Sequence, residues 1–397
     1  MNKDSEVSRQ RSYFSSNKLR SGLAALTGLT LSSAAMAGVT INGPGDSWLS
    51  LGAGLRTSYT SLEKGAPDGT SSSNDFEIDS VRIFTSGQIM KGIKATINFE
   101  RTPAESMRVM DAIGQFEPSD VFNFWMGRML PAADRANLAG PYYENAWQYP
   151  GVVSQRPAIF AGRDTGATIW GKPMGGKLVY AVGAFKGHNN VTGGSNMSDK
   201  LMYSGRISYA FLDPEPAPAY YVGNTYYGSN DIFTLGVGFM RQTNGVGTST
   251  AKGDYKTWNA DALFEKKMGA GGAFTFEGAY YNYDFGGVRD CGDGLPGAVA
   301  CPAGDNVGGT VAGKAYLATV AYLIPGKVGV GQFQPFVRYQ EFKRDVTSTK
   351  NEQSDFGVNY VIAGHNARIS AVYSKLKDPL AKVLDRKQFI LGLQLQY

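Results

Sequence analysis

The chain ends on the stretch KQFILGLQLQY, residues 387–397, in which apolar and polar side chains alternate over most of its length. The polar parity consists of glutamines and a glycine, with Ile390 as an apolar exception. The apolar parity consists of Phe389, Leu391, Leu393, Leu395 and Tyr397. Because successive residues of a strand point to opposite faces, this stretch predicts a β-strand with one apolar face. That face would pack on a second sheet in a sandwich, or contact lipid in a closed barrel with a wet interior.

The first 37 residues have the order of a secretory signal peptide. Lys18 and Arg20 precede an apolar run over residues 23–31, and small residues follow up to Ala37. The run is shorter than the ~18 residues that a membrane helix needs, and the Ala-x-Ala sequence that ends at Ala37 is typical of a cleavage site. We therefore expect a signal peptide over residues 1–37 and a mature domain over residues 38–397, that is 397 − 37 = 360 residues.

The mature chain contains no apolar run long enough for a membrane helix, so a membrane-spanning domain of this composition must be a β-barrel. Its 51 glycines suit turns, and its 22 tyrosines and 21 phenylalanines suit the aromatic girdles of such barrels. The formal charge of +5 includes +3 from the leader, which leaves +2. Since no basic cluster stands out, nucleic acid is not an expected partner, whereas outer-membrane lipid is.

Sixteen alternating runs follow one another from Trp48–Tyr59 to the terminal stretch, and their connections are short and long by turns. An even count places both termini on the side of the short turns, as in bacterial barrels with periplasmic turns and external loops. Barrels of ~16 strands enclose a water-filled channel. The pattern predicts an all-β, transmembrane antiparallel barrel of about 16 strands, within two. One connection, residues 212–230, is too long for a tight turn.

Charged residues occupy positions that the alternation turns towards the barrel interior. The basic candidates for the lumen lining are Arg56, Arg82, Lys94, Arg206, Arg338 and Arg368. The acidic candidates are Glu100, Asp261, Glu277 and Asp355, with Glu265 on the same parity. Because the two signs nearly balance, they predict a lumen that is weakly anion-preferring or nearly nonselective.

Residues 129–164 form the longest irregular stretch, and in the sixteen-strand scheme they are the third external loop. Loops of this length in compact folds are usually functional. With its flanks, the loop offers six charged candidates for a pore constriction: Arg128, Asp134, Arg135, Glu144, Arg156 and Arg163. Opposed charges at a constriction create a transverse field, and surplus guanidinium groups favour anions. Alternatively, the arginines pair with neighbouring carboxylates and brace the loop, and Asp134 with Arg135 is the first such pair to expect.

The chain contains only two cysteines and two histidines, the residues that most often build catalytic and metal sites. Cys291 and Cys301 lie in a glycine-rich segment, and in an oxidising compartment we expect a disulfide that closes a surface loop. His188 and His365 would lie at opposite ends of the barrel, and neither is near a G-x-S-x-G sequence, so we expect no enzyme. Two remote histidines and a cysteine pair make no metal site, and no cofactor is expected.

Three stretches resemble proteobacterial porins of the phosphate-selective porin O/P-like superfamily, which includes short-chain amide porins. These stretches are GRMLPAADRANLAGPYYENAW at 127–147, DPEPAPAYYVGNTYYGSND at 213–231 and HNARIS at 365–370. The similarity runs over most of the mature chain. It implies a homotrimer of sixteen-stranded barrels in the outer membrane of a Gram-negative bacterium, with the third loop folded into the lumen. It also implies that the barrel-assembly machinery recognises the C-terminal strand ending at Tyr397.

The resemblance implies a water-filled channel for passive diffusion of small hydrophilic solutes. Phosphate-selective members use an arginine ladder and a lysine cluster, whereas the third loop of this chain contains no lysine. We therefore expect at most a weak preference for phosphate or other small anions. A nonselective or short-chain amide or urea channel remains an alternative. A structural barrel that does not conduct is a further alternative, and it would apply if the third loop plugged the lumen.

Overall fold

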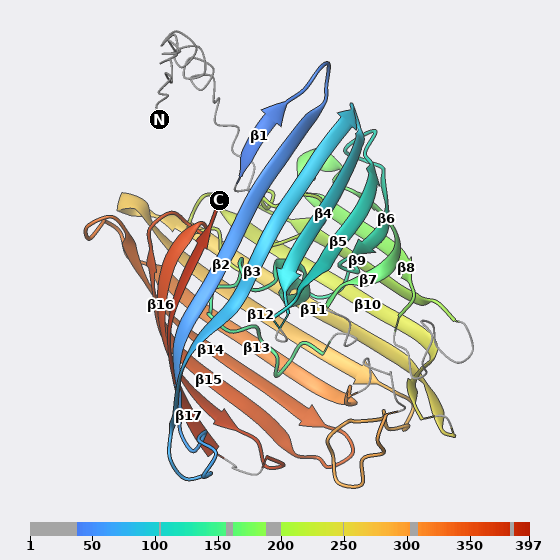
Figure 1. Ribbon diagram of the computed structural model, residues 1–397, viewed down its shortest axis with the longest axis vertical. Helices are drawn as coiled ribbons and strands as arrows, with labels where there is room; N and C mark the ends of the chain where they lie inside the picture. Colours follow the sequence, from blue (N-terminus) through green and yellow to red (C-terminus); the bar gives the residue numbers. More distant parts are fainter. Residues whose placement is uncertain are drawn as a thin grey trace, which may run out of the picture. The chain divides into compact units, whose positions relative to one another are not determined.

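The computed structural model describes residues 38–102, 105–155, 162–187, 200–248, 250–301, 309–381 and 385–397. The expected signal peptide, His188 and the candidate Arg156 lie outside these ranges. In the described part of the chain, sixteen antiparallel strands, β2 to β17, follow one another around a closed barrel (Figure 1). The barrel closes where β17 pairs with β2, from Gln388 opposite Leu62 to Gln396 opposite Gly54. The prediction of an all-β barrel of about 16 strands is confirmed.

The strands follow the predicted runs closely, with ends that differ by a few residues. The first eight are β2 (Trp48–Leu62), β3 (Ser73–Met90), β4 (Ile93–Arg101), β5 (Met107–Phe116), β6 (Asn123–Met129), β7 (Asp164–Gly171), β8 (Leu178–Phe185) and β9 (Met202–Ala210). The second eight are β10 (Ile232–Gly247), β11 (Lys252–Met268), β12 (Gly272–Asp284), β13 (Gly313–Leu323), β14 (Gln332–Arg344), β15 (Lys350–Val361), β16 (Ala367–Lys377) and β17 (Asp385–Gln396). A short helix, α1 (Arg135–Ala139), lies between β6 and β7.

One additional strand, β1 (Val39–Asn42), was not predicted from the alternation. It pairs with β2 from Val39 opposite Leu51 to Asn42 opposite Trp48. The C-terminal residue Tyr397 exchanges two backbone hydrogen bonds with Ala53 of the same edge, at 2.9 and 3.0 Å. Residues 48–51 of β2 thus pair with β1, whereas residues 53–62 pair with the C-terminal strand. Its four residues alternate apolar and polar, but the run is short and all four residues are exposed.

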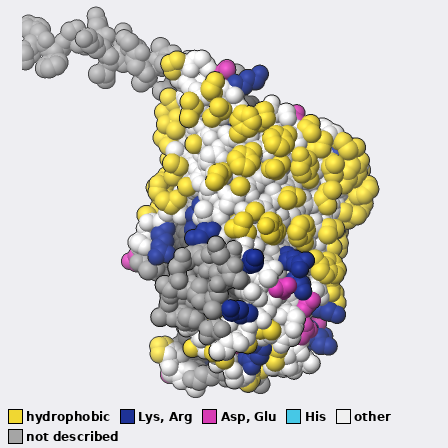
Figure 2. Space-filling view, turned by 90° about the vertical axis from the view of Figure 1, so that its right-hand side faces the viewer, with side chains coloured by type: hydrophobic (Ala, Val, Ile, Leu, Met, Phe, Trp, Pro, Cys, Tyr) yellow, Lys and Arg dark blue, Asp and Glu magenta, His cyan; other side chains and the backbone are white. Residues whose placement is uncertain are grey.

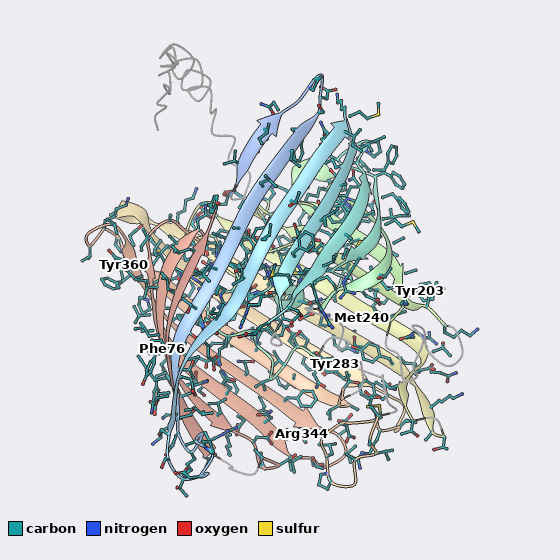
Figure 3. All side chains as sticks on the ribbon, in the orientation of Figure 1. Phe76, Tyr203, Met240, Tyr283, Arg344 and Tyr360 are labelled. Atoms are coloured by element: carbon teal, nitrogen blue, oxygen red, sulfur yellow. A yellow bond between two sulfur atoms is a disulfide. The ribbon has the colours of Figure 1, made fainter. Side chains whose placement is uncertain are left out.

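The predicted alternation is realised as an apolar exterior and a polar interior. On β17, Leu391 is 46% exposed on the outer face, whereas the neighbouring inward position Gln394 is fully buried. Phe76 and Tyr203 lie on the outer surface, while Met240 and Tyr283 lie inside (Figure 3). Figure 2 shows that apolar side chains cover much of the wall and that charged side chains gather towards one end. Among the described residues, no helix combines the length and the apolarity needed to cross a membrane.

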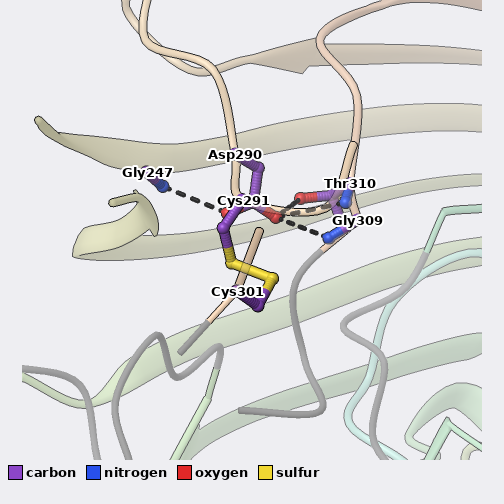
Figure 4. Close-up of a disulfide and its surroundings, with 6 residues drawn as sticks. All are labelled: Gly247, Asp290, Cys291, Cys301, Gly309 and Thr310. Atoms are coloured by element: carbon purple, nitrogen blue, oxygen red, sulfur yellow. Dashed lines mark hydrogen bonds between the residues drawn. A yellow bond between two sulfur atoms is a disulfide. The ribbon is translucent and has the colours of Figure 1, made fainter. Parts of the chain in front are cut away.

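A disulfide joins Cys291 and Cys301 in the connection between β12 and β13 (Figure 4). Beside it, the buried carboxylate of Asp290 accepts hydrogen bonds from the backbone N–H groups of Gly247, Gly309 and Thr310, each at 3.1 Å. The Thr310 hydroxyl donates a fourth hydrogen bond at 2.8 Å. Because Gly247 ends β10, the carboxylate fastens this connection to a neighbouring strand of the barrel.

Candidate functional site

Residues 130–155, 162 and 163, called loop 3 below, are the described residues between β6 and β7, and they fold into the barrel (Figure 1). Leu130 and the α1 residues have almost no exposed surface, and Tyr142 and Trp147 are also buried. The inward faces of the strands are largely polar but also carry apolar residues, and loop 3 adds apolar side chains of its own. There Leu130 and Leu138 join a cluster with inward-facing residues of the wall such as Trp125. Loop 3 therefore occupies the lumen as a packed segment.

A second segment enters the lumen from the opposite end. Residues 211–231, called the inner connection below, link β9 to β10, and Tyr220, Asn224 and Thr225 are buried within the barrel. The Tyr220 hydroxyl donates to the carbonyl of Leu130 at 2.7 Å, and the Asn224 N–H donates to the carbonyl of Tyr143 at 3.0 Å. The connection is too long for a turn because it reaches across the lumen to loop 3.

Arg135 of α1 joins loop 3, the inner connection and the wall. Its two terminal nitrogens donate to the two carboxylate oxygens of Glu215 at 2.9 and 2.7 Å. Its Nε donates to Asp261 of β11 at 3.0 Å, and Nη1 also donates to the carbonyl of Gly223 at 2.8 Å. The expected pairing with the adjacent Asp134 is wrong, because a helical Arg135 reaches across the lumen to carboxylates of other segments.

The electrostatics at this junction favour the charged forms of both partners. Burial acts to lower the pKa of Arg135, but the charges of Glu215 and Asp261 outweigh it and raise that pKa well above its usual value. Burial acts to raise the pKa of Glu215, but Arg135 outweighs it and lowers that pKa. Fully buried charges of this kind are tolerated only when they are paired and hydrogen-bonded. Removing one partner would therefore leave an uncompensated buried charge.

Four of the predicted lumen-lining arginines project inward, as the alternation predicts, and each ends on a backbone carbonyl of loop 3. Arg338 donates to the carbonyl of Gln148 at 2.7 Å, and Arg368 donates to that of Glu144 at 2.6 Å. The other two carbonyl contacts are Arg56 to Trp147 and, at 3.3 Å, Arg206 to Ala133. All four side chains are buried, so they hold loop 3 in place instead of standing free in water.

Most of the predicted charges, including Arg206 and Arg338, also form ion pairs or hydrogen bonds inside the barrel, several of them between neighbouring strands. The pairs are Arg82 with Glu100 at 2.9 Å, Lys94 with Glu117 at 2.6 Å, Arg163 with Asp111 at 3.0 Å, Arg206 with Asp261 at 2.8 Å, and Arg338 with Asp355 at 2.8 Å. Arg128 is half-buried and donates to the carbonyl of Met110 at 3.3 Å. Asp134 accepts a hydrogen bond from the Ser154 hydroxyl at 2.6 Å. The sequence interpretation missed Asp111, Glu117 and Glu215 as partners.

Glu144 of loop 3 and Glu277 of β12 share one amide. Asn224 of the inner connection donates to both carboxyl groups, at 2.7 and 2.9 Å. Burial and the nearby charge of Glu277 raise the pKa of Glu144 well above its usual value. The negative charge of Glu144 is thus disfavoured in this part of the lumen.

His365, in the turn between β15 and β16, is a structural contact and not a titrating group near neutral pH. Its Nε2–H donates to the carbonyl of Thr225 in the inner connection at 2.8 Å. Burial and the charge of Arg368 lower the pKa of His365 to about 3, so the ring is neutral. No group of three or more His, Cys, Asp or Glu suited to a metal ion is found in the part of the chain that the structure describes.

A cavity of about 400 Å³ remains beside loop 3, on the side of the wall formed by β2 to β7. Its wall positions include Trp48, Thr96 and Lys94, and its inner side is formed by loop 3 and the inner connection. Trp48 begins β2 and Lys94 lies next to the start of β4, so the cavity reaches the short-turn end of the barrel. The opposite wall carries Arg338 and Arg368, which hold loop 3. The open space in the lumen is thus off-centre.

Gly392 of β17 lets the ring of Trp147 lie against the wall, because a Cβ there would come within 2.5 Å of a ring atom. We expect Gly392→Ala to displace Trp147 and to lower the free energy of unfolding by about 1–3 kcal/mol. Thermal unfolding of the folded barrel, followed by its gel mobility without boiling, would measure the change. Gly114→Ala is the matched control, since a Cβ at Gly114 would meet only a carbonyl oxygen at 3.8 Å. Equal unfolding temperatures for the two variants would contradict the contact.

Comparison with known proteins shows the fold. No family model and no curated sequence matches the chain. The anion-selective porin from Comamonas acidovorans matches with a TM-score of 0.58 and 12% identity over 89% of this chain and 100% of that one. OmpF of Salmonella typhi, in complex with daunomycin, matches with a TM-score of 0.58 and 12% identity over 90% and 100%. OmpT of Vibrio cholerae matches with a TM-score of 0.55 and 12% identity over 90% and 100%. The chain therefore has the fold of sixteen-stranded outer-membrane porins.

Proposed function

We propose that this chain is a porin of a Gram-negative outer membrane, a non-enzymatic channel for passive diffusion of small hydrophilic solutes. The observation that carries the proposal is a closed sixteen-stranded barrel, apolar outside and polar inside, that keeps an open cavity beside its inward-folded loop. A barrel of ~16 strands is too wide to be filled by its own wall side chains. The likeness to solved porins supports this fold-level reading.

The solute path that we propose runs past the wall of β2 to β7. Loop 3 and the inner connection fill the other side of the lumen and are bound there by Arg135, Arg338 and Arg368. Four backbone carbonyls and two buried carboxylates fix these segments, so the constriction is rigid. The residues at positions 127–147, 213–231 and 365–370 all take part in this arrangement. Their resemblance supports membership of the porin O/P-like superfamily.

A weak preference for phosphate or other small anions belongs to the proposal. Arg82, Arg135 and Arg163 have carboxylate partners, whereas the hydrogen bonds of Arg56 run to a carbonyl and those of Arg368 to carbonyl, hydroxyl and amide oxygens. The two latter guanidinium groups leave positive charge beside the constriction, which favours anions. Since the other charges nearly cancel, the preference is small.

The reversal potential across a planar bilayer under a potassium chloride gradient tests both the proposed channel and its proposed anion preference. We expect the purified, refolded protein to conduct with a small potential on the anion side, which Arg56→Gln moves towards zero because it removes one charge beside the constriction. Arg241→Gln is the control, because Arg241 is exposed on the outer parity of β10 and its ion pair with Asp254 is long, at 3.9 Å. A cation-side potential would contradict the anion preference alone. A folded barrel without conductance would contradict the channel.

The partners that we propose follow from the same fold. One matched structure of Vibrio cholerae OmpT is described as a trimer form. We propose a homotrimer in the outer membrane, targeted by a signal peptide over residues 1–37 and assembled through the C-terminal strand that ends at Tyr397. Native mass spectrometry of the folded protein distinguishes a trimer from a monomer.

A structural barrel without a conducting pore is the second candidate. The observation that favours it is the number of segments inside the barrel, since loop 3 and the inner connection meet in the lumen. The conductance measurement decides between the two candidates directly.

A further inference from the structure

We infer that the cavity beside loop 3 binds uncharged solutes that carry an aromatic or similar apolar ring. The inference rests on the proposed porin function and names the solute class that would pass or dwell in this channel. It arises from the juxtaposition of inward-facing aromatic side chains of β2 to β6 with the apolar face of the inner connection across a cavity of about 400 Å³.

Several aromatic rings line this cavity. Trp48, Phe84 and Trp125 contribute rings from the wall, and Tyr142 and Tyr221 contribute rings from loop 3 and the inner connection. Other buried aromatic side chains, such as Tyr255, Tyr281 and Phe342, belong to the packed core and do not line this cavity. Aromatic rings attract other rings in offset or edge-to-face arrangements, beyond the gain from apolar burial. A ring-bearing solute would therefore find several ring partners around one open space.

The aromatic side chains are held in fixed positions before any solute arrives. The Trp125 indole N–H donates to Glu117 at 2.9 Å, and its ring lies 5.4 Å from that of Trp170 and 5.9 Å from that of Tyr221. The inner side of the cavity includes Pro216 and Pro218, whose rings restrict the backbone. Preorganised partners lower the entropy cost of binding.

The charged groups of the cavity favour an uncharged solute. Lys94 is paired with Glu117 at 2.6 Å, Arg163 with Asp111 at 3.0 Å, and Arg82 with Glu100 at 2.9 Å. A charged solute would have to compete with these pairs, whereas an uncharged polar substituent can share hydrogen bonds at their edges. Small-molecule sites usually enclose ~300–1,000 Å³ and combine apolar lining with a few polar groups. The cavity meets both conditions.

Benzamide is the probe that we would use first, because it joins one ring to one uncharged amide. Added to the folded protein in a planar bilayer, it is expected to reduce the ion current in a saturable manner. Acetamide, which has the amide without the ring, is expected to have no saturable effect. Benzoate, which has the ring and a charge, is expected to bind at least several-fold more weakly. Equal effects of benzamide and acetamide would overturn the role of the ring. Benzoate as effective as benzamide would overturn the preference for uncharged solutes.

Three variants locate the site. Trp125→Leu and Phe84→Leu are each expected to raise the apparent Kd for benzamide by about 3- to 10-fold, as the loss of one ring–ring contact implies. Phe84 makes no hydrogen bond, so its replacement keeps the polar contacts of the fold. Trp258→Leu is the matched control, because Trp258 is 46% exposed on the outer face of β11. Unchanged affinity in both cavity variants would overturn the site.

The failure of this inference and the failure of the proposed function give different results. Loss of the benzamide effect with normal potassium chloride conductance contradicts the inference and keeps the porin. If the folded barrel does not conduct, calorimetric titration of benzamide into the same protein, with acetamide and the Phe84→Leu variant as controls, still measures the site. Absence of benzamide binding there overturns the inference as well.

Discussion

Replacing Arg135 with glutamine is expected to lower the free energy of unfolding by about 3–5 kcal/mol, because it leaves buried carboxylates without their partner. Arg135 is fully buried and joins Glu215, Asp261 and the carbonyl of Gly223. Glutamine cannot make all these contacts, so loop 3 and the inner connection would separate. We therefore also expect a larger and noisier single-channel conductance. Thermal unfolding and planar-bilayer recordings on the same preparation measure the two effects.

The control for this prediction is Arg241→Gln, since Arg241 is an exposed arginine with a distant carboxylate. The double variant Arg135→Gln with Glu215→Gln removes the charge on both sides and is expected to recover part of the lost stability. It is not expected to restore the original conductance, because the bidentate contact is still absent. An Arg135→Gln protein as stable as the Arg241→Gln control would contradict the role given to this side chain.

Shortening the inner connection is expected to produce the largest change in conductance. Replacing residues 214–229 by Asn-Gly leaves enough chain for a turn between β9 and β10 and removes Glu215, Tyr220 and Asn224 from the lumen. Because pore diameter controls conduction, we expect the single-channel conductance to rise about two-fold or more. Loss of Asn224 and the Tyr220 hydroxyl should also loosen loop 3, which makes the recordings noisier.

The matched control shortens the connection between β2 and β3 at residues 64–71, which is mostly exposed and, among the described residues, makes no hydrogen bond or ion pair with loop 3. That variant is expected to conduct like the unaltered protein. If removal of residues 214–229 left the conductance unchanged, the inner connection would not narrow the path.

Most of the barrel follows from the sequence because lipid and a wet lumen impose strict alternation. The terminal stretch is such a case, since Leu391 faces outward and Gln394 faces inward. Strand ends were less predictable. The strand β10 continues to Gly247, beyond the last alternating apolar residues, because its pairing with β11 resumes at Val246 opposite Gly253 after an irregularity that follows Gln242. The strand β1 alternates over only four residues, Val39–Asn42, which is too short a run to stand out, and it forms by pairing with the edge of β2.

The sequence predicted which charged side chains point into the barrel, but it did not predict which residues they contact. Parity along a strand says that Arg338 and Arg368 point inward, but it does not say what lies opposite. Their carbonyl partners Gln148 and Glu144 are 190 and 224 residues away in sequence. Glu215 lies in an irregular Pro-rich segment where no parity applies, so its pairing with Arg135 had no signal except that Glu215 is the one charged residue of positions 214–230.

The position of the open path beside β2 to β7 is tested most directly by two single-cysteine variants. Thr96→Cys places a thiol on the cavity wall, and Ser370→Cys places one on a fully buried inward position of β16 next to Asn359. The native cysteines are bonded to each other and do not react. When a charged methanethiosulfonate reagent is added to conducting channels, the current through Thr96→Cys is expected to fall and that through Ser370→Cys to persist. The reverse result would place the path on the other side of loop 3 and contradict the account.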